Sequence, residues 1–162
     1  MLARFGAAPT YNACFCASHV LQYLARDSEC RLVYNGDIDF DLHGFSDADW
    51  AGDLLTRRST AGFAIFAKGG PLAWQSKLQL VVATSSLESE YMAMYSGISE
   101  MIWIRGIIKE IGLFNELIKG PTPFLVDSQS AKDLAGNPVY HKRSKHIDIK
   151  FHWLRQHVNC TS

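Results

Sequence analysis

The sequence predicts an α/β domain in which a mixed sheet is flanked by helices. Strand patterns run through residues 41–77, a long helical pattern follows at residues 85–112, and a short apolar strand comes after it at residues 124–126. Strands that are joined by tight turns pair antiparallel, whereas a strand that is reached through a helix runs parallel to its neighbour. We therefore expect three antiparallel strands and then one parallel strand.

The length and composition fit one domain with its own core. The chain has 162 residues, of which 48% are hydrophobic, and sixteen basic residues balance sixteen acidic ones. Because the net charge is zero, a nucleic-acid binder of this kind needs a local basic patch. Four cysteines lack the spacing of a zinc site, which indicates reduced thiols: Cys14, Cys16, Cys30 and Cys160. No run reaches about 18 apolar residues, so we expect no membrane segment, and the start does not have the pattern of a signal peptide.

Before the long helix, we expect one helix and then a series of strands. Residues 11–26 repeat apolar side chains at the i, i+3, i+4 spacing of a helix. Residues 32–37 are typical of a short strand that ends in an Asn-Gly turn. Residues 41–50 alternate, so that every second side chain from His43 to Asp49 lies on one face of a strand.

Two further strands are expected in residues 59–77, around a Gly-Gly-Pro turn at residues 69–71. Apolar side chains alternate onto both faces of this pair, so we expect both faces to be covered. The long helix is predicted to begin at a capping box made by Ser85 and Glu88, and to end at Gly112.

The last part of the chain is predicted to add one strand and two helices. The strand at residues 124–126 runs directly into Asp127, and a short helix follows that closes at residues 136–138. A basic segment at residues 141–146 then leads to a helical pattern over residues 147–158.

Three carboxylates stand where a protein core does not favour them. Asp47 lies at the inner end of a strand, Asp127 follows a buried strand, and Glu90 borders the apolar stripe of the long helix. Glu88 already has a structural role in the capping box, which makes Glu90 the better candidate. Carboxylates that gather without basic partners suit a hard cation such as Mg²⁺. A purely structural role is an alternative for each of the three carboxylates; Asp127, for example, would also serve as an N-cap.

The stretch around Asp47 holds two further acidic residues, Asp49 and Asp53. A calcium-binding EF-hand loop that starts at Asp47 would place Arg58 where the loop needs a bidentate Glu, so that kind of site is excluded. We interpret Asp49 as a neighbour that supports Asp47 from the same strand face. Asp53 is expected in a turn or on the surface.

Six sequence motifs occur in order between about residues 42 and 158. They are "GFSDADWAGD", "RRSTAGFAIF", "GGPLAWQSK", "ATSSLESEYMAM", "VDSQSA" and "NPVYHKRSKHIDIKFHWLR". Together they resemble the ribonuclease H domain of copia-type retrotransposon Pol polyproteins. The preceding segment resembles the end of the reverse transcriptase in the same polyprotein. The resemblance therefore implies a remnant of the reverse transcriptase tail in residues 1–40 and a ribonuclease H-like domain in residues 41–162.

The resemblance implies a ribonuclease H-like fold and hydrolysis of the RNA strand in RNA–DNA hybrids with two Mg²⁺ or Mn²⁺ ions. In the matching motifs, Asp47, Glu90 and Asp127 stand at the positions of the family's catalytic, metal-binding carboxylates. The fourth catalytic carboxylate of the family is either Asp148 or a residue that the chain lacks. We expect the latter, together with truncation of the last strand and helix.

Two alternative functions belong to other classes. One is a catalytically incomplete ribonuclease H-like remnant, which only binds nucleic acid or has no activity. The other is an integrase-type strand transferase, which would need a Glu on a late helix and a His/Cys zinc module; the sequence shows neither.

Basic side chains in two segments are expected to bind the phosphate backbone, although charged loops are often only solvated. They are Arg57, Arg58, His141, Lys142, Arg143, Lys145 and His146. We expect Trp74 and Trp153 in the core rather than against a nucleotide. The implied partners are an RNA–DNA hybrid and the reverse transcriptase portion of the same polyprotein, with no membrane. The implied location is intracellular: the cytoplasm, a virus-like particle or the nucleus.

Overall fold

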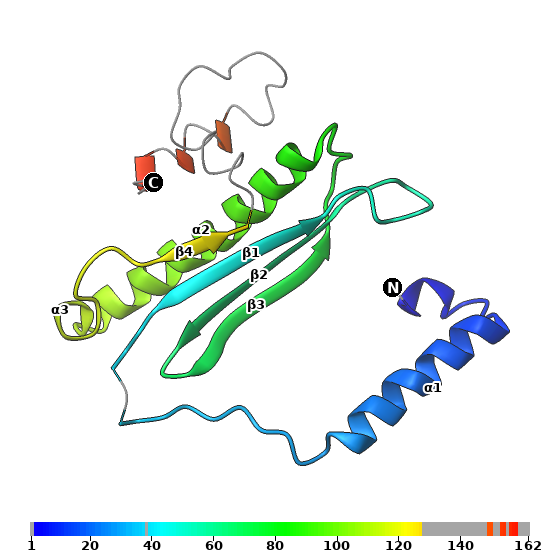
Figure 1. Ribbon diagram of the computed structural model, residues 1–162, viewed down its shortest axis with the longest axis horizontal. Coiled ribbons are helices and arrows are strands. Elements are labelled where there is room, and N and C mark those ends of the chain that lie inside the picture. The colour runs from blue at the N-terminus through cyan, green and yellow to red at the C-terminus, as the bar shows by residue number, and fades with distance from the viewer. Residues whose placement is uncertain (1, 38, 128–148, 151–152, 155, 159–162) are drawn as a thin grey trace. The chain divides into compact units, whose positions relative to one another are not determined.

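A computed structural model describes most of the chain (Figure 1). The described residues are 2–37, 39–127, 149–150, 153–154 and 156–158. The chain forms two compact units, residues 1–32 and residues 33–162.

The first unit contains a short 3₁₀ helix, Leu2–Phe5, and the helix α1, Tyr11–Arg26. The bounds of α1 confirm the helix that the apolar spacing predicts. Its N-cap is Thr10, whose side chain accepts the amide hydrogen of Ala13 at 3.3 Å. None of its residues is buried. The thiols of Cys14, Cys16 and Cys30 are exposed and free.

The second unit is built on a four-stranded sheet in the order β3-β2-β1-β4 (Figure 1). The strands are β1 His43–Asp49, β2 Thr60–Ala67, β3 Gly70–Leu78 and β4 Phe124–Val126. Strand β2 pairs antiparallel with β1 and with β3, whereas β4 pairs parallel with β1. This arrangement confirms the predicted mixed sheet.

The strand predicted at residues 32–37 is wrong. These residues form no strand, and a turn occupies Gly36 and Asp37. The Asn35 amide donates one hydrogen bond, of 2.9 Å, to the carbonyl of Lys68. A single bond of this kind does not make a ladder, so the Asn-Gly signal here marks only a turn.

Helix α2, Ser86–Glu110, has the two ends that the sequence predicts. At its start, the Ser85 hydroxyl accepts the amide hydrogen of Glu88 at 3.2 Å. The Glu88 carboxylate reaches back to the amide and hydroxyl of Thr84, at 2.6 and 2.7 Å, so that the capping box is displaced by one residue.

At the other end of α2, Gly112 adopts a φ of +81°. Its amide donates to the carbonyl of Lys109, and the Leu113 amide donates to that of Ile108, both at 3.1 Å. These two bonds form a Schellman motif, which ends the helix.

Helix α2 packs across one face of the sheet. Two core clusters lie along this face. The first contains Tyr91, Met94, Ile98, Val126 and Leu154. The second contains Leu42, Ile65, Ala67, Met101, Ile108 and Ile118. Arg105 is the one charged residue in the apolar stripe of α2. It lies over the ring of Phe114, in the short helix α3 (Phe114–Leu117), and donates a hydrogen bond to the hydroxyl of Thr122.

The opposite face of the sheet differs from what the sequence predicts. No described helix of the second unit covers it, and Trp74 is 63% exposed. Phe45, His43 and Phe66 pack against one another on this face, with ring centroids 5.6 to 5.9 Å apart. The expectation that Trp74 lies in the core is therefore wrong within the described residues.

Candidate metal centre

Three elements bring one carboxylate each to the same place. Asp47 lies near the end of β1, Glu90 in the first turns of α2, and Asp127 directly after β4. Each offers one oxygen atom, and these three atoms lie within 4.8 Å of one another. Among the residues that the structure describes, no other group of three acidic, His or Cys side chains meets this condition. We call these three residues the carboxylate cluster.

The parallel pairing of β1 with β4 explains why two members of the cluster are neighbours. Ser46 pairs with Val126, so the next residues along the chain, Asp47 in β1 and Asp127 just after β4, lie side by side. The carboxyl ends of parallel strands are the usual place for a ligand site in an α/β sheet.

Glu90 and Glu88 have different roles on α2. Glu88 is held by Thr84 at the start of the helix. Gly97, Met101 and Ile108 are buried on the face of α2 that packs on the sheet. Glu90 precedes them by 7, 11 and 18 residues, which are nearly whole numbers of helical turns, so it lies on the same face. The structure thus brings Glu90, and not Glu88, to Asp47 and Asp127.

The electrostatics of the cluster centre on Glu90. Burial, together with the nearby charges of Asp127 and Asp47, raises the pKa of Glu90 from 4.5 to about 7, although a hydrogen bond from the Ala48 amide opposes this shift. One buried oxygen of Glu90, Oε2, has no hydrogen-bond partner among the described residues. A carboxylate oxygen without a donor, facing two more carboxylates, suits a divalent cation such as Mg²⁺ or Mn²⁺.

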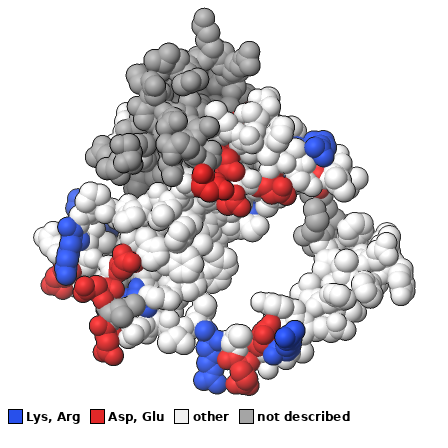
Figure 2. All heavy atoms as spheres, viewed as in Figure 1, with Lys and Arg blue, Asp and Glu red and all other residues white. Residues whose placement is uncertain are grey.

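The cluster carries negative charge that basic side chains do not offset in the described part of the chain. No ion pair is formed there by Asp47, Glu90 or Asp127. Figure 2 shows acidic side chains gathered near the carboxyl ends of β1 and β4. Asp47 is held in place through its Oδ1, which accepts the amide hydrogen of Ala48 at 2.8 Å. The sequence gives no signal for this backbone donor.

The other two acidic residues of the motif at residues 44–53, Asp49 and Asp53, have different roles in and before the loop that follows β1. Asp53 is only 2% exposed, and its carboxylate accepts hydrogen bonds from the amide and hydroxyl of Thr56. Asp53 therefore holds a turn, as the sequence predicts, and it is buried there rather than on the surface. Asp49 is exposed, and its carboxylate fills the space that a Cβ on Gly52 would need.

The predicted basic residues fall into a described and an undescribed set. Arg57 is exposed and has a φ of +55°, and Arg58 is half-buried, both in the loop that follows β1. The remaining predicted residues lie outside the described residues: His141, Lys142, Arg143, Lys145, His146 and Asp148.

A hydrogen bond that the sequence does not predict joins the loop after β1 to the segment that leads into α2. The indole nitrogen of Trp50 donates to the carbonyl of Ala83 at 3.1 Å. A tryptophan beside the acidic motif is the only sequence signal for it. The bond links the segment after Asp47 with the segment that leads to Glu90.

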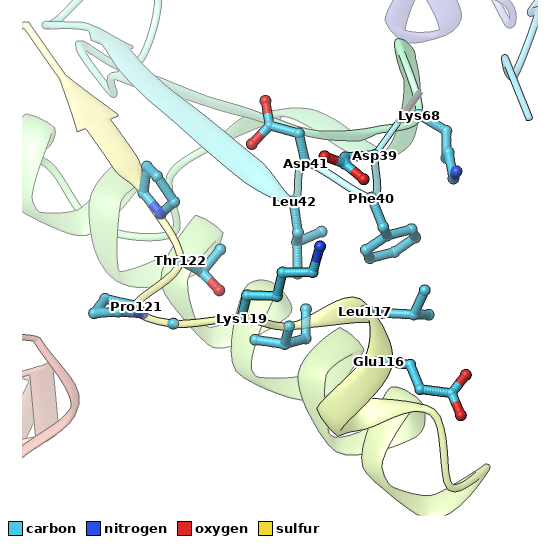
Figure 3. A pocket seen from close by; sticks show the side chains of 13 residues that line it. Asp39, Phe40, Asp41, Leu42, Lys68, Glu116, Leu117, Lys119, Pro121 and Thr122 are labelled. Carbon is cyan, nitrogen blue, oxygen red and sulfur yellow. The ribbon is translucent and has the colours of Figure 1, made fainter. Parts of the chain in front are cut away.

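Cavities lined by described residues adjoin the sheet. One, of about 550 Å³, is mostly apolar and runs along the uncovered sheet face between Phe45 and Leu125 to Asp47 and Asp127. Another, of about 560 Å³, lies between the segments 39–42 and 116–123 (Figure 3). We call the second one the far cavity.

The far cavity has acidic side chains that do not converge. In Figure 3, Asp41 and Glu116 stand on opposite sides, with their carboxylates directed apart. Lys68 and Lys119 also line this cavity. It therefore lacks the chemistry of the carboxylate cluster.

Comparison with known proteins finds homologues among the retrovirus-related Pol polyproteins. The chain is 41% identical, over 145 residues that cover 88% of it, to the retrovirus-related Pol polyprotein from transposon TNT 1-94 of Nicotiana tabacum. It is 35% identical, over 97% of its length, to the retrovirus-related Pol polyprotein from transposon RE1 of Arabidopsis thaliana. These homologues are copia-type retrovirus-related Pol polyproteins. The chain spans about a tenth of the length of these relatives, 10% in both cases.

Other comparisons add less. The Secreted RxLR effector protein 161 of Plasmopara viticola is 38% identical over 64% of this chain and 73% of its own length. A solved chain of LC11-RNase H1, isolated from compost, has a TM-score of 0.45 and 18% identity, over 72% of this chain and 74% of that one. No protein-family model matches the chain. In the described residues, no helix has the length and apolar character needed to cross a membrane.

Proposed function

We propose that residues 41–162 form a ribonuclease H-like domain that hydrolyses the RNA strand of RNA–DNA hybrids with divalent metal ions. The observation that carries the proposal is the carboxylate cluster, in which three separate elements bring oxygens within 4.8 Å of one another. The similarity of the chain to Pol polyproteins supports it, because reverse transcription produces such hybrids. Residues 1–40 are proposed as the end of the reverse transcriptase.

In the proposed mechanism, Asp47, Glu90 and Asp127 hold two Mg²⁺ or Mn²⁺ ions. When bound, the metal supplies a Lewis acid and an activated water for attack on the phosphodiester. The Ala48 amide fixes the orientation of Asp47. To hold a cation, Glu90 would have to be ionised, and burial together with the charges of Asp127 and Asp47 raises its pKa to about 7.

The same proposal assigns the nucleic-acid contacts. Arg57 and Arg58 lie in the loop that follows β1, about ten residues beyond Asp47, where they would contact phosphates. The basic segment at residues 141–146 is proposed for the same role. Selection of RNA would come from 2′-hydroxyl contacts in the wide minor groove of the hybrid. The proposed partner is the reverse transcriptase portion of the polyprotein, and the proposed location is intracellular.

The test is cleavage of a labelled RNA–DNA hybrid by the purified chain in Mg²⁺ or Mn²⁺. We expect the wild type and an Asp39→Asn control, altered in the far cavity, to cleave the RNA strand, and Asp127→Asn to lose this activity. Cleavage that survives Asp127→Asn would show that the cluster is not the active site. Binding of the hybrid without cleavage by the wild type would instead favour a catalytically incomplete remnant.

A further inference from the structure

One aromatic ring lies where the three elements of the carboxylate cluster meet. Phe124 begins β4, pairs with Gly44 of β1, and packs against both core clusters. A Cβ added to Gly44 would lie 2.7 Å from two atoms of the Phe124 ring. A Cβ added to Gly97 of α2 would overlap the same ring and would lie 3.0 Å from the Cβ of Phe63. We call Gly44, Gly97 and Phe124 the ring junction.

Gly97 lowers the stability of helix α2, so its presence there needs a structural explanation. A glycine within a helix destabilises it by roughly 1 kcal/mol relative to alanine. Gly97 is buried, and the ring of Phe124 fills the space that an alanine methyl group would take. Gly106, in the same helix, is exposed and has no described atom within 4 Å of an added Cβ. Gly97 therefore serves close packing, whereas Gly106 offers a matched control.

Each carboxylate follows or precedes the ring junction by a similar length of its own element. Asp47 follows Gly44 by three residues, and Asp127 follows Phe124 by three residues, which is about 10 Å along each strand. Glu90 precedes Gly97 by seven residues, which is two turns and also about 10 Å along the same face of the helix. Strands β1 and β4 and helix α2 thus meet at the ring junction, and each runs from there to its own carboxylate in the cluster.

We propose that Phe124 is a positioning residue for the metal centre, and that Gly44 and Gly97 must lack side chains to admit its ring. The ring sets how closely α2 approaches β1 and holds β4 against β1. Metal ligands require oxygen positions that are correct to a fraction of an ångström, so a small displacement at the junction weakens binding. The proposal rests on the proposed function, because it takes the carboxylates as metal ligands.

The test measures Mn²⁺ affinity by calorimetry and the urea midpoint of the metal-free chain. Gly106→Ala should raise the urea midpoint and leave the affinity unchanged. Gly97→Ala should lower the affinity by at least about tenfold, the range seen when the support of a ligand is lost. Adding Phe124→Leu to Gly97→Ala removes ring atoms that the new methyl group strikes, and should restore part of the affinity.

The urea midpoints separate positioning from simple loss of stability. Affinities are compared only between variants that are folded in the assay, because Phe124→Leu also relieves the clash that destabilises Gly97→Ala. Phe124→Leu by itself keeps an apolar side chain, and should fold and bind Mn²⁺ more weakly than the wild type. Unchanged affinity in Gly97→Ala or in Phe124→Leu, or no recovery in the double variant, overturns the proposal.

A metal-free measurement keeps this inference separate from the proposed function. If the folded wild type binds no Mn²⁺, the metal centre fails as a proposal. The ring junction is then tested with Glu90→Gln at pH 8. This substitution removes a negative charge that Asp47 and Asp127 repel, so it should raise the urea midpoint of the metal-free chain. This gain should be smaller in the Gly97→Ala background than in the Gly106→Ala background. Equal gains in both backgrounds overturn the positioning role.

Discussion

Acidic residues gather at both ends of the sheet, but only one end brings three of them together. At the carboxyl ends of β1 and β4, the oxygens of the cluster lie within 4.8 Å of one another. At the other end, the acidic residues line the far cavity beside two lysines. They are Asp39, Asp41 and Glu116. The cluster converges because paired strands and a packed helix fix its members, whereas the acids of the far cavity come mainly from connecting segments.

The largest expected effect concerns metal binding at the two ends. Asp47→Asn should weaken Mn²⁺ binding by roughly 100-fold or more, because it removes a ligand rather than the support of one. Asp39→Asn, in the far cavity, should leave the affinity unchanged. Calorimetric titration with Mn²⁺ measures both. Equal losses in the two variants would show that binding reflects general negative charge and not the cluster.

A second substitution separates folding from metal binding at the cluster end. Asp53→Ala should lower the free energy of unfolding by about 1–2 kcal/mol, because it removes the cap of the loop and leaves Thr56 without its acceptor. Asp49→Ala, at an exposed position, should change it by less than about 0.5 kcal/mol. Urea denaturation checks both values. A loss of Mn²⁺ affinity in folded Asp53→Ala would contradict its purely structural role.

The pH dependence of stability should come from the cluster end. The pKa of Glu90 is raised in the folded chain, so its contribution to stability is fully present below about pH 4.5 and is lost as the pH rises to about 7. Solvent screening limits this loss to about 1 kcal/mol. Urea midpoints of the metal-free chain between pH 4.5 and 8 should therefore fall less for Glu90→Gln than for the wild type. The same profile in both chains would argue against this assignment, and Glu116→Gln serves as the control.

The smallest effect is expected for the arginine loop. Arg57→Gln should weaken binding of an RNA–DNA hybrid and reduce the slope of log affinity against log salt by about 1, as the loss of one phosphate contact does. Lys119→Gln, which alters the far cavity, should keep the wild-type slope. Fluorescence anisotropy at several salt concentrations gives both slopes. If Lys119→Gln changes the slope as much as Arg57→Gln does, the hybrid is not confined to the cluster end.

The sequence predicts the elements well where local signals agree. The caps at Ser85 and Gly112 bound α2, and the capping role of Glu88 leaves Glu90 for the cluster. The strands around the turn at residues 69–71 follow from their alternating pattern. The strand predicted at residues 32–37 fails because its turn signal has no pairing strand to act on.

Features that depend on tertiary contacts could not be predicted in the same way. The pattern Asp-x-x-Thr at Asp53 signals a local cap, but its burial depends on how the loop packs. The ring junction joins Gly44, Gly97 and Phe124, which are far apart in the sequence, so no local pattern reveals it. The uncovered sheet face around Trp74 likewise depends on what packs there.

The most direct test of the account is a crystal structure of the chain with Mn²⁺, located by its anomalous scattering. The account predicts Mn²⁺ between Asp47, Glu90 and Asp127, bound to oxygens at about 2.0–2.3 Å. A Glu90→Gln crystal should show much weaker anomalous density at the same place. Mn²⁺ in the far cavity alone, or none in a crystal of folded wild type, would contradict the central claim.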